Sequence, residues 1–178
     1  MTKLTSDPLL ALGKIVVILA QALMGLAAAA VAIGTPIVLL MKDKAQADLR
    51  AELGNPDFIF PAFSIAGLLI LALAILLMAF FFFDRLRRII DSVGAGDPFE
   101  PANATRLTAM AWLMLGIQLL AIPAAGLGLY LVKIMEETEA TVDASLDLSG
   151  IVMVVTLFIL ARVFRHGSAM RADLEGTV

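Results

Sequence analysis

Four long apolar segments constrain the fold of this sequence more than any other feature. We place them at about 15–41, 58–83, 107–132 and 146–165, and the first three contain no charged residue. An α-helix rises 1.5 Å per residue, so roughly 20 apolar residues cross the hydrocarbon core of a bilayer. The sequence therefore predicts an all-α membrane protein, a bundle of four transmembrane helices forming a single domain over 1–178.

The fourth segment is the shortest, because its uncharged part covers only 148–161. That length is compatible with either a membrane span or a buried helix. Arg162 and Arg165 follow it, and their long side chains can reach the headgroups while the helix continues past them. We therefore interpret this segment as a fourth span. The first segment is too long for the apolar part of a cleaved signal peptide, so we expect it to be a span as well.

The distribution of Lys and Arg predicts how the spans are oriented. Nine of these residues lie on one face and four on the other. An excess of Lys and Arg marks the cytoplasmic face, so we expect both termini, a loop at 84–106 and a tail at 166–178 to be cytoplasmic. The nine are Lys3, Lys14, Arg85, Arg87, Arg88, Arg106, Arg162, Arg165 and Arg171, and the four are Lys42, Lys44, Arg50 and Lys133.

Composition excludes several kinds of chemistry. The chain has no cysteine and one histidine, His166, so disulfides, thiolate nucleophiles and clusters of His ligands are ruled out. No catalytic set of residues is found, and we expect no enzyme activity, no metal and no cofactor. Asn103-Ala104-Thr105 matches a glycosylation sequon, but that short motif is weak and falls in the cytoplasmic loop of the predicted topology.

Two glutamines are the most polar side chains well inside the spans. Gln21 lies in the first segment and Gln118 in the third. Such side chains often hydrogen-bond across neighbouring helices, which is the interpretation we favour. The alternative is a polar pathway through a small transporter or channel-like subunit, although pathways usually contain carboxylates or histidines.

The two loops that flank the second span have clear turn signals. In the first loop, 42–53 is compatible with a short helix that Gly54-Asn55-Pro56 would end. After the second span, 84–93 has an apolar face and a charged face, which predicts that the helix continues beyond the membrane. We expect i, i+4 ion pairs there, Asp84 with Arg88 and Arg87 with Asp91.

The segment "GAGDPF" begins at Gly94 and looks at first like a phosphate-binding loop. It lacks the following Lys and Ser or Thr that such a loop needs, so we reject that interpretation. Gly94 and Gly96 instead end the helix, and Asp97-Pro98 turns the chain. We expect Phe99 to be buried against the bundle and Pro101 to open the third span.

Two quoted stretches carry a family resemblance. "AGDPFEPANATRLTAMAWL" starts at Ala95, and "LARVFRHGSAMRADLEGTV" starts at Leu160. Both resemble the bacterial membrane proteins grouped as DUF2975, in which a basic end of the second span precedes a Gly-x-Pro-Phe turn. The resemblance implies a multi-pass protein of the bacterial inner membrane. It also implies, through neighbouring genes, a small helix-turn-helix regulator as a partner.

We therefore expect a non-enzymatic regulatory, scaffold or sensor component that acts through its cytoplasmic loop and tail. Membrane lipids, the helix-turn-helix regulator and a homo-oligomer are the expected partners, and direct nucleic-acid binding is not expected. The candidate surface for a partner or for lipid comprises Arg85, Arg87, Arg88, Gly96, Asp97, Pro98, Phe99, Arg106, Arg165, Arg171, Asp173, Leu174, Thr177 and Val178.

Overall fold

Five α-helices make up the part of the chain that the structure describes, residues 8–135 and 148–175 of a computed structural model. In chain order they are α1 (Pro8–Leu40), α2 (Lys42–Leu53), α3 (Ala62–Gly94), α4 (Pro101–Met135) and α5 (Leu148–Glu175), and no strand occurs in these ranges. Helices α1, α3, α4 and α5 are long and apolar enough to cross a membrane. The predicted all-α fold with four spans is confirmed.

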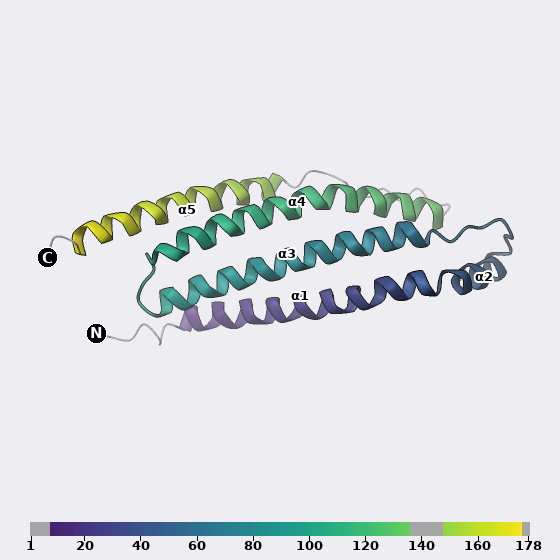
Figure 1. The fold of residues 1–178 in the computed structure, drawn as a ribbon, viewed down its shortest axis with the longest axis horizontal. Coiled ribbons are helices and arrows are strands. Elements are labelled where there is room, and N and C mark those ends of the chain that lie inside the picture. The colour runs from purple at the N-terminus through teal and green to yellow at the C-terminus, as the bar shows by residue number, and fades with distance from the viewer. Residues whose placement is uncertain (1–7, 136–147, 176–178) are drawn as a thin grey trace.

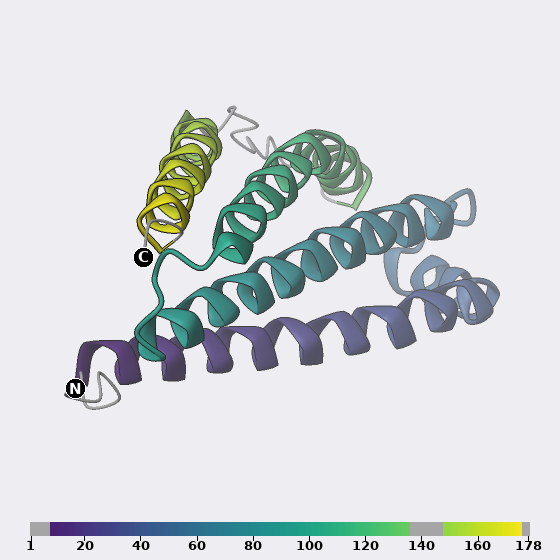
Figure 2. The same ribbon diagram turned by 60° about the vertical axis from the view of Figure 1, so that its left-hand side comes forward.

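The four long helices pack in chain order as an open, curved row. α1 packs on α3, α3 on α4, and α4 on α5 (Figures 1 and 2). α1 and α5 therefore form the two edges of the row. The starts of α1 and α4 and the ends of α3 and α5 lie at the same end of the molecule, which we call the turn end (Figure 1). The sequence indicated four helices but not this open order.

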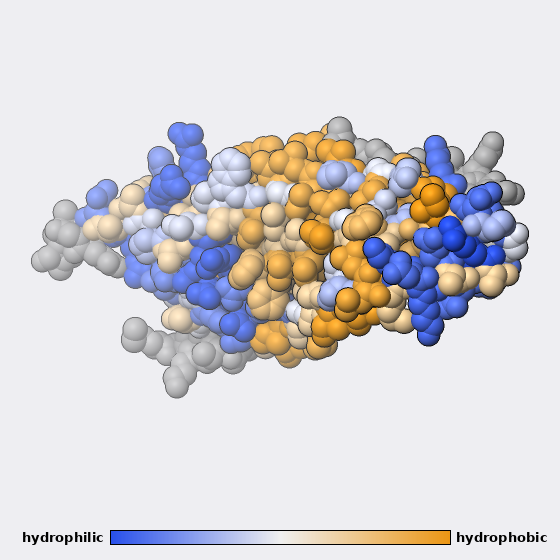
Figure 3. Space-filling model, turned by 45° about the vertical axis from the view of Figure 1, so that its right-hand side comes forward, coloured by the Kyte–Doolittle hydropathy of each residue, from blue (hydrophilic) through white to orange (hydrophobic). Residues whose placement is uncertain are grey.

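The surface matches a protein that spans a bilayer. A broad apolar band crosses the middle of the face shown in Figure 3, and hydrophilic side chains gather at both ends. Many large apolar side chains are exposed within the band, among them Leu19 at 64% and Leu26 at 72%. In water such exposure would be costly, whereas in lipid it is expected.

A small core joins three of the helices. Five residues are buried together there: Leu107, Met110 and Ala111 of α4 with Leu157 and Ala161 of α5. Phe82, Leu86 and Ile89 of α3 pack against this group, which thus links α3, α4 and α5. Several of these residues lie close to the turn end, so packing and polar contacts are concentrated in the same region.

Several predicted boundaries are confirmed, and others shift. The short helix of the first loop is α2, and Gly54 ends it in the left-handed conformation at φ 61°. α3 continues to Gly94 and α4 begins at Pro101, as expected. The segment expected to be a tail is instead mostly helix, because α5 runs on to Glu175. Residues 1–7, 136–147 and 176–178 lie outside the described residues.

Prolines are accommodated inside two helices. α1 contains Pro36 and α4 contains Pro123, and both helices are continuous through these positions. α4 changes direction along its length, as Figures 1 and 2 show. Proline removes a backbone hydrogen bond and is a common cause of such bends.

Candidate functional site

The turn between α3 and α4 is held by its own backbone. The N–H groups of Ala95, Gly96 and Asp97 donate to carbonyls of the last turn of α3, at 3.0 Å each. Gly96 has φ 87°, a conformation that a side chain disfavours. The glycine therefore allows the chain to reverse within a few residues, which brings the start of α4 against the end of α3.

A buried amide braces this turn. Asn103 of α4 is fully buried, and its Nδ2 donates to Ser92 Oγ at 2.7 Å and to the Pro98 carbonyl at 3.0 Å. Ser92 in turn donates to the carbonyl of Ile89 at 2.8 Å. One side chain thus contacts α3, the turn and α4 at once. Since this amide is buried and hydrogen-bonded, it is not a glycosylation acceptor.

Arg106 extends the same network towards the surface. Its Nη1 donates to Asn103 Oδ1 at 2.7 Å and to Glu100 Oε2 at 2.9 Å. The same atom lies 3.4 Å from the carbonyl of Arg88, at the limit of a hydrogen bond. The Arg106 side chain is 21% exposed, so much of this contact is shielded from solvent. Arg106 therefore joins α4 to the preceding turn rather than facing a partner freely.

The basic end of α3 is partly neutralised by acidic neighbours. Arg88 pairs with Asp84 at 2.9 Å, as predicted. The predicted pair between Arg87 and Asp91 is wrong: Arg87 approaches Asp84 at 3.9 Å, while Asp91 pairs with Lys14 of α1 at 2.6 Å. The reason is a contact between helices that local spacing does not reveal. The Lys14 pair joins α1 to α3 at the turn end.

Phe99 lies at the surface of the turn and contacts α5. Its ring centroid is 5.6 Å from that of Phe164. A Cβ built on Gly167 would lie 2.7 Å from a ring carbon of Phe99, so only glycine permits this approach without a shift. The prediction that Phe99 would be buried is wrong, because 42% of the residue is exposed. The open row of helices leaves the ring covered by α5 on one side only.

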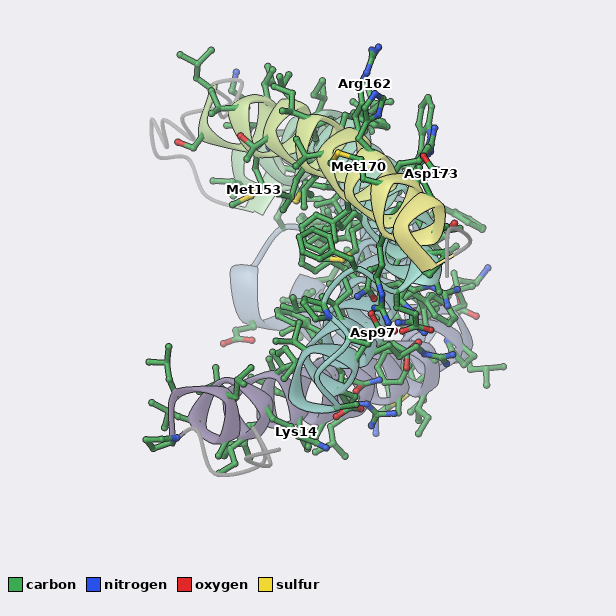
Figure 4. The ribbon with its side chains drawn as sticks, turned by 90° about the vertical axis from the view of Figure 1, so that its left-hand side faces the viewer. Lys14, Asp97, Met153, Arg162, Met170 and Asp173 are labelled. Atoms are coloured by element: carbon green, nitrogen blue, oxygen red, sulfur yellow. The ribbon has the colours of Figure 1, made fainter. Side chains whose placement is uncertain are left out.

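The end of α5 meets the turn through an ion pair. Arg171 pairs with Asp97, and both side chains are nearly half exposed. Asp97 projects from the turn between the ends of the flanking helices, while Met170 and Asp173 lie on the last turns of α5 (Figure 4). The structure thus brings together Gly96, Asp97, Pro98, Phe99 and Arg171 of the predicted surface.

The remaining residues of the predicted surface lie on α3, α4 and α5 or outside the described part of the chain. Arg85 lines a groove between α3 and α4. Arg165 is exposed on α5. Leu174 belongs to the final turn of α5, but its side chain is outside the described part, as are Thr177 and Val178.

The two glutamines lie on different helix pairs. Gln118 of α4 packs directly on Gly150 of α5, where an added Cβ would collide with its amide. Gln21 belongs to α1, which packs on α3 and not substantially on α4. The structure therefore does not bring the two amides into one site.

Sequence reasoning missed the residues that brace the turn. From the sequence, Asn103 was considered only as part of a weak glycosylation sequon, and Ser92 and Glu100 were not singled out. An asparagine just inside a helix, preceded by a Gly-Asp-Pro turn, was the available signal, because such a position lets an amide reach back across the turn. The Lys14 contact left no local signal at all.

These features define a multi-pass helical membrane protein whose helix ends are joined by polar contacts at one end. The family model described as "Protein of unknown function (DUF2975)" matches residues 40–178, so this chain belongs to that family. The match includes α2 to α5 and the braced turn, and it leaves out α1 except for its last residue. No curated protein and no solved structure matches the chain.

Proposed function

We propose that this protein is a non-enzymatic regulatory or scaffold component of the bacterial inner membrane, and that it acts through the turn end. The observation that carries the proposal is the surface formed where the α3–α4 turn meets α5. There Asp97 pairs with Arg171, and Phe99 remains 42% exposed beside Gly167. Loop and tail, which are far apart in the sequence, thus form one continuous surface.

The chemistry of this surface suits a protein partner. Phe99 belongs to the same turn as Asp97, and Met170, which is 62% exposed, precedes Arg171 on α5. Aromatic and methionine side chains, combined with charges at the rim, are typical of protein interfaces. The surface lies beyond the apolar band (Figure 3), so a soluble protein can reach it. The excess of Lys and Arg at this end supports a cytoplasmic location for it.

The nature of the partner rests on the family resemblance. Genes of the family lie beside those of small helix-turn-helix regulators, so we infer that such a regulator docks on the turn end. Retention of a DNA-binding protein at the membrane would then change how much of it reaches its operator.

Co-purification tests this proposal. The tagged full-length protein and a variant ending before Arg171 would each be mixed with the helix-turn-helix protein encoded beside its gene. We expect capture by at least one of them and weaker capture by Phe99→Ser. Asp48→Arg, which changes a charge on α2 at the opposite end, serves as the matched control and should capture normally. Failure of both the intact and the shortened protein would overturn the proposal.

The alternative, a small transporter or channel-like subunit, has less support. Among the described residues, neither Gln21 nor Gln118 lines the groove between α3 and α4 or a second groove between α1 and α3. Because the chain has no cysteine, Gln21→Cys and Gln118→Cys would each give a single reactive thiol. A water-filled pathway predicts that a membrane-impermeant thiol reagent modifies both. Absence of labelling would rule out that pathway.

A further inference from the structure

A groove between α3 and α4 combines an apolar wall with one arginine. It has a volume of about 470 Å³, within the range of small-molecule sites. Three lining residues come from α3 and three from α4: Met78, Phe81, Arg85, Ala109, Trp112 and Leu113. From Met78 to Arg85 the groove follows α3 for about 10 Å, given the rise of an α-helix. Arg85 therefore lies at its mouth, nearest the turn end.

Arg85 differs from the two other arginines at the end of α3. Arg87 and Arg88 both approach Asp84, which is the nearest acidic residue. Within 8–135 and 148–175, Arg85 takes part in no ion pair. Its charge is therefore available to an anion, and the groove that it lines contains no carboxylate.

The depth of this arginine also matters. Arg85 comes directly after Asp84, two residues beyond the end of the uncharged stretch at Phe83 and about 14 Å before the helix ends at Gly94. Trp112 of α4 lies about 16 Å from the start of its helix and is 61% exposed. Arginine and tryptophan at the same level mark the boundary between hydrocarbon and headgroups. A phosphate at that boundary would meet Arg85, and the chain attached to it would enter the groove.

We propose that this groove is a binding site for one anionic phospholipid. The headgroup phosphate pairs with Arg85, and an acyl chain lies along Phe81, Met78 and Leu113. A basic pocket between transmembrane helices is a recognised way to select anionic lipids. The site is independent of any regulator and of the orientation in the membrane.

A second groove provides an internal contrast. It lies between α1 and α3, has a volume of about 380 Å³, and is lined only by apolar residues, including Ala32 and Leu77. It can accept an acyl chain, but it offers nothing to distinguish one headgroup from another. Of these two grooves, the α3–α4 groove should therefore be the one that selects anionic lipid.

Native mass spectrometry of the full chain tests the proposal. The protein would be purified from nanodiscs containing equal amounts of phosphatidylglycerol and phosphatidylcholine with the same acyl chains. We expect one retained phosphatidylglycerol per chain, and a preference that falls about fivefold in Arg85→Gln. Arg88→Gln removes the same charge one turn away and should retain the preference, as should Arg85→Lys.

Filling the groove gives a second, separate measurement. Ala109→Leu should displace the retained lipid, whereas Ala32→Leu fills the other groove and should leave it in place. Equal losses in Arg85→Gln and Arg88→Gln would show general surface attraction and overturn the site. Equal retention of the two lipids by the unaltered protein, or unchanged retention in Ala109→Leu, would overturn it too.

Discussion

The two turns that flank α3 contain the same residue types but are held in different ways. Each has a glycine at positive φ, 61° at Gly54 and 87° at Gly96. An asparagine lies in or just after each turn. The Asn55 side chain is exposed and accepts from the N–H of Asp57 at 3.0 Å, whereas Asn103, just inside α4, is fully buried and contacts both helices and the turn.

An arginine also contacts each turn, Arg50 the first and Arg106 the second, and the two arginines again differ in what they bind. Arg50 Nε donates to the single carbonyl of Phe58 at 2.8 Å. Arg106 contacts a carboxylate and an amide. The first turn ends a short surface helix, while the second aligns two long helices in the membrane. Apolar surface gives little preference for one helix partner over another in lipid, so directional polar contacts at the second turn help to set the alignment.

The largest expected effect separates the two asparagines. Asn103→Ala should destabilise the protein by about 2–3 kcal/mol, because buried polar groups around it lose their partner. Asn55→Ala should change stability by no more than about 0.5 kcal/mol, as is usual at the surface. Unfolding in a dodecyl sulfate titration, followed by the fluorescence of the single tryptophan Trp112, measures both. Similar losses in the two variants would contradict the contrast.

Replacing Arg106 should also destabilise the protein more than replacing Arg50, but the difference should be smaller than that between the two asparagines. Arg106→Gln is expected to cost about 1–2 kcal/mol, since it removes charge-assisted contacts to Glu100 and Asn103. Arg50→Gln removes contacts to the carbonyl of Phe58 and to the side-chain oxygen of Gln46, and it should cost about 0.5 kcal/mol. The same titration at low and high salt provides a check. The cost at Arg106 should persist in high salt because its side chain is only 21% exposed.

The contrast also explains how much of the fold could be predicted. Segment length and hydropathy predicted the four long helices, and Gly-Asn-Pro and Gly-Asp-Pro-Phe predicted both turns, because these are local properties. Asn55 lies in its turn and Asn103 just inside α4, and that position was the local signal that Asn103 could reach back across the turn, but it did not give the depth of burial. That distinction arises only when α4 packs on α3.

For the candidate site, the sequence predicted where its segments lie but not which side chains make contact. The sequence indicated that the turn and the end of α5 would lie at one end, since an even number of spans requires it. It did not predict that Asp97 would pair with Arg171. It also did not predict that Asp91 would pair with Lys14 of α1 and not with Arg87. Those contacts depend on the order of the helices in the row, which hydropathy does not encode.

Replacing Gly54 or Gly96 by alanine should cost a similar amount of stability. This prediction tests whether the two turns differ in their side-chain contacts or in their backbones. Gly54→Ala and Gly96→Ala should each cost about 1–2 kcal/mol, because each backbone has a positive φ that an L-residue disfavours. An added Cβ at Gly54 would have open space around it. If the costs agree while those of the asparagines differ, the turns differ in side-chain contacts and not in backbone strain. A cost at Gly96 far above that at Gly54 would shift the explanation to the backbone.

The smallest effect is expected for the ion pair between Asp97 and Arg171. Both side chains are more than 40% exposed, and exposed pairs typically contribute about 0.2–1 kcal/mol. A double-mutant cycle with Asp97→Asn and Arg171→Gln measures the coupling, and Lys14 with Asp91 offers a second pair of similar exposure for comparison. A coupling well above 1 kcal/mol would mean that the end of α5 stabilises the turn as strongly as Arg106 does. A small coupling means that this ion pair can open at little cost, so that Asp97 becomes accessible to a partner without disturbing the network around Asn103.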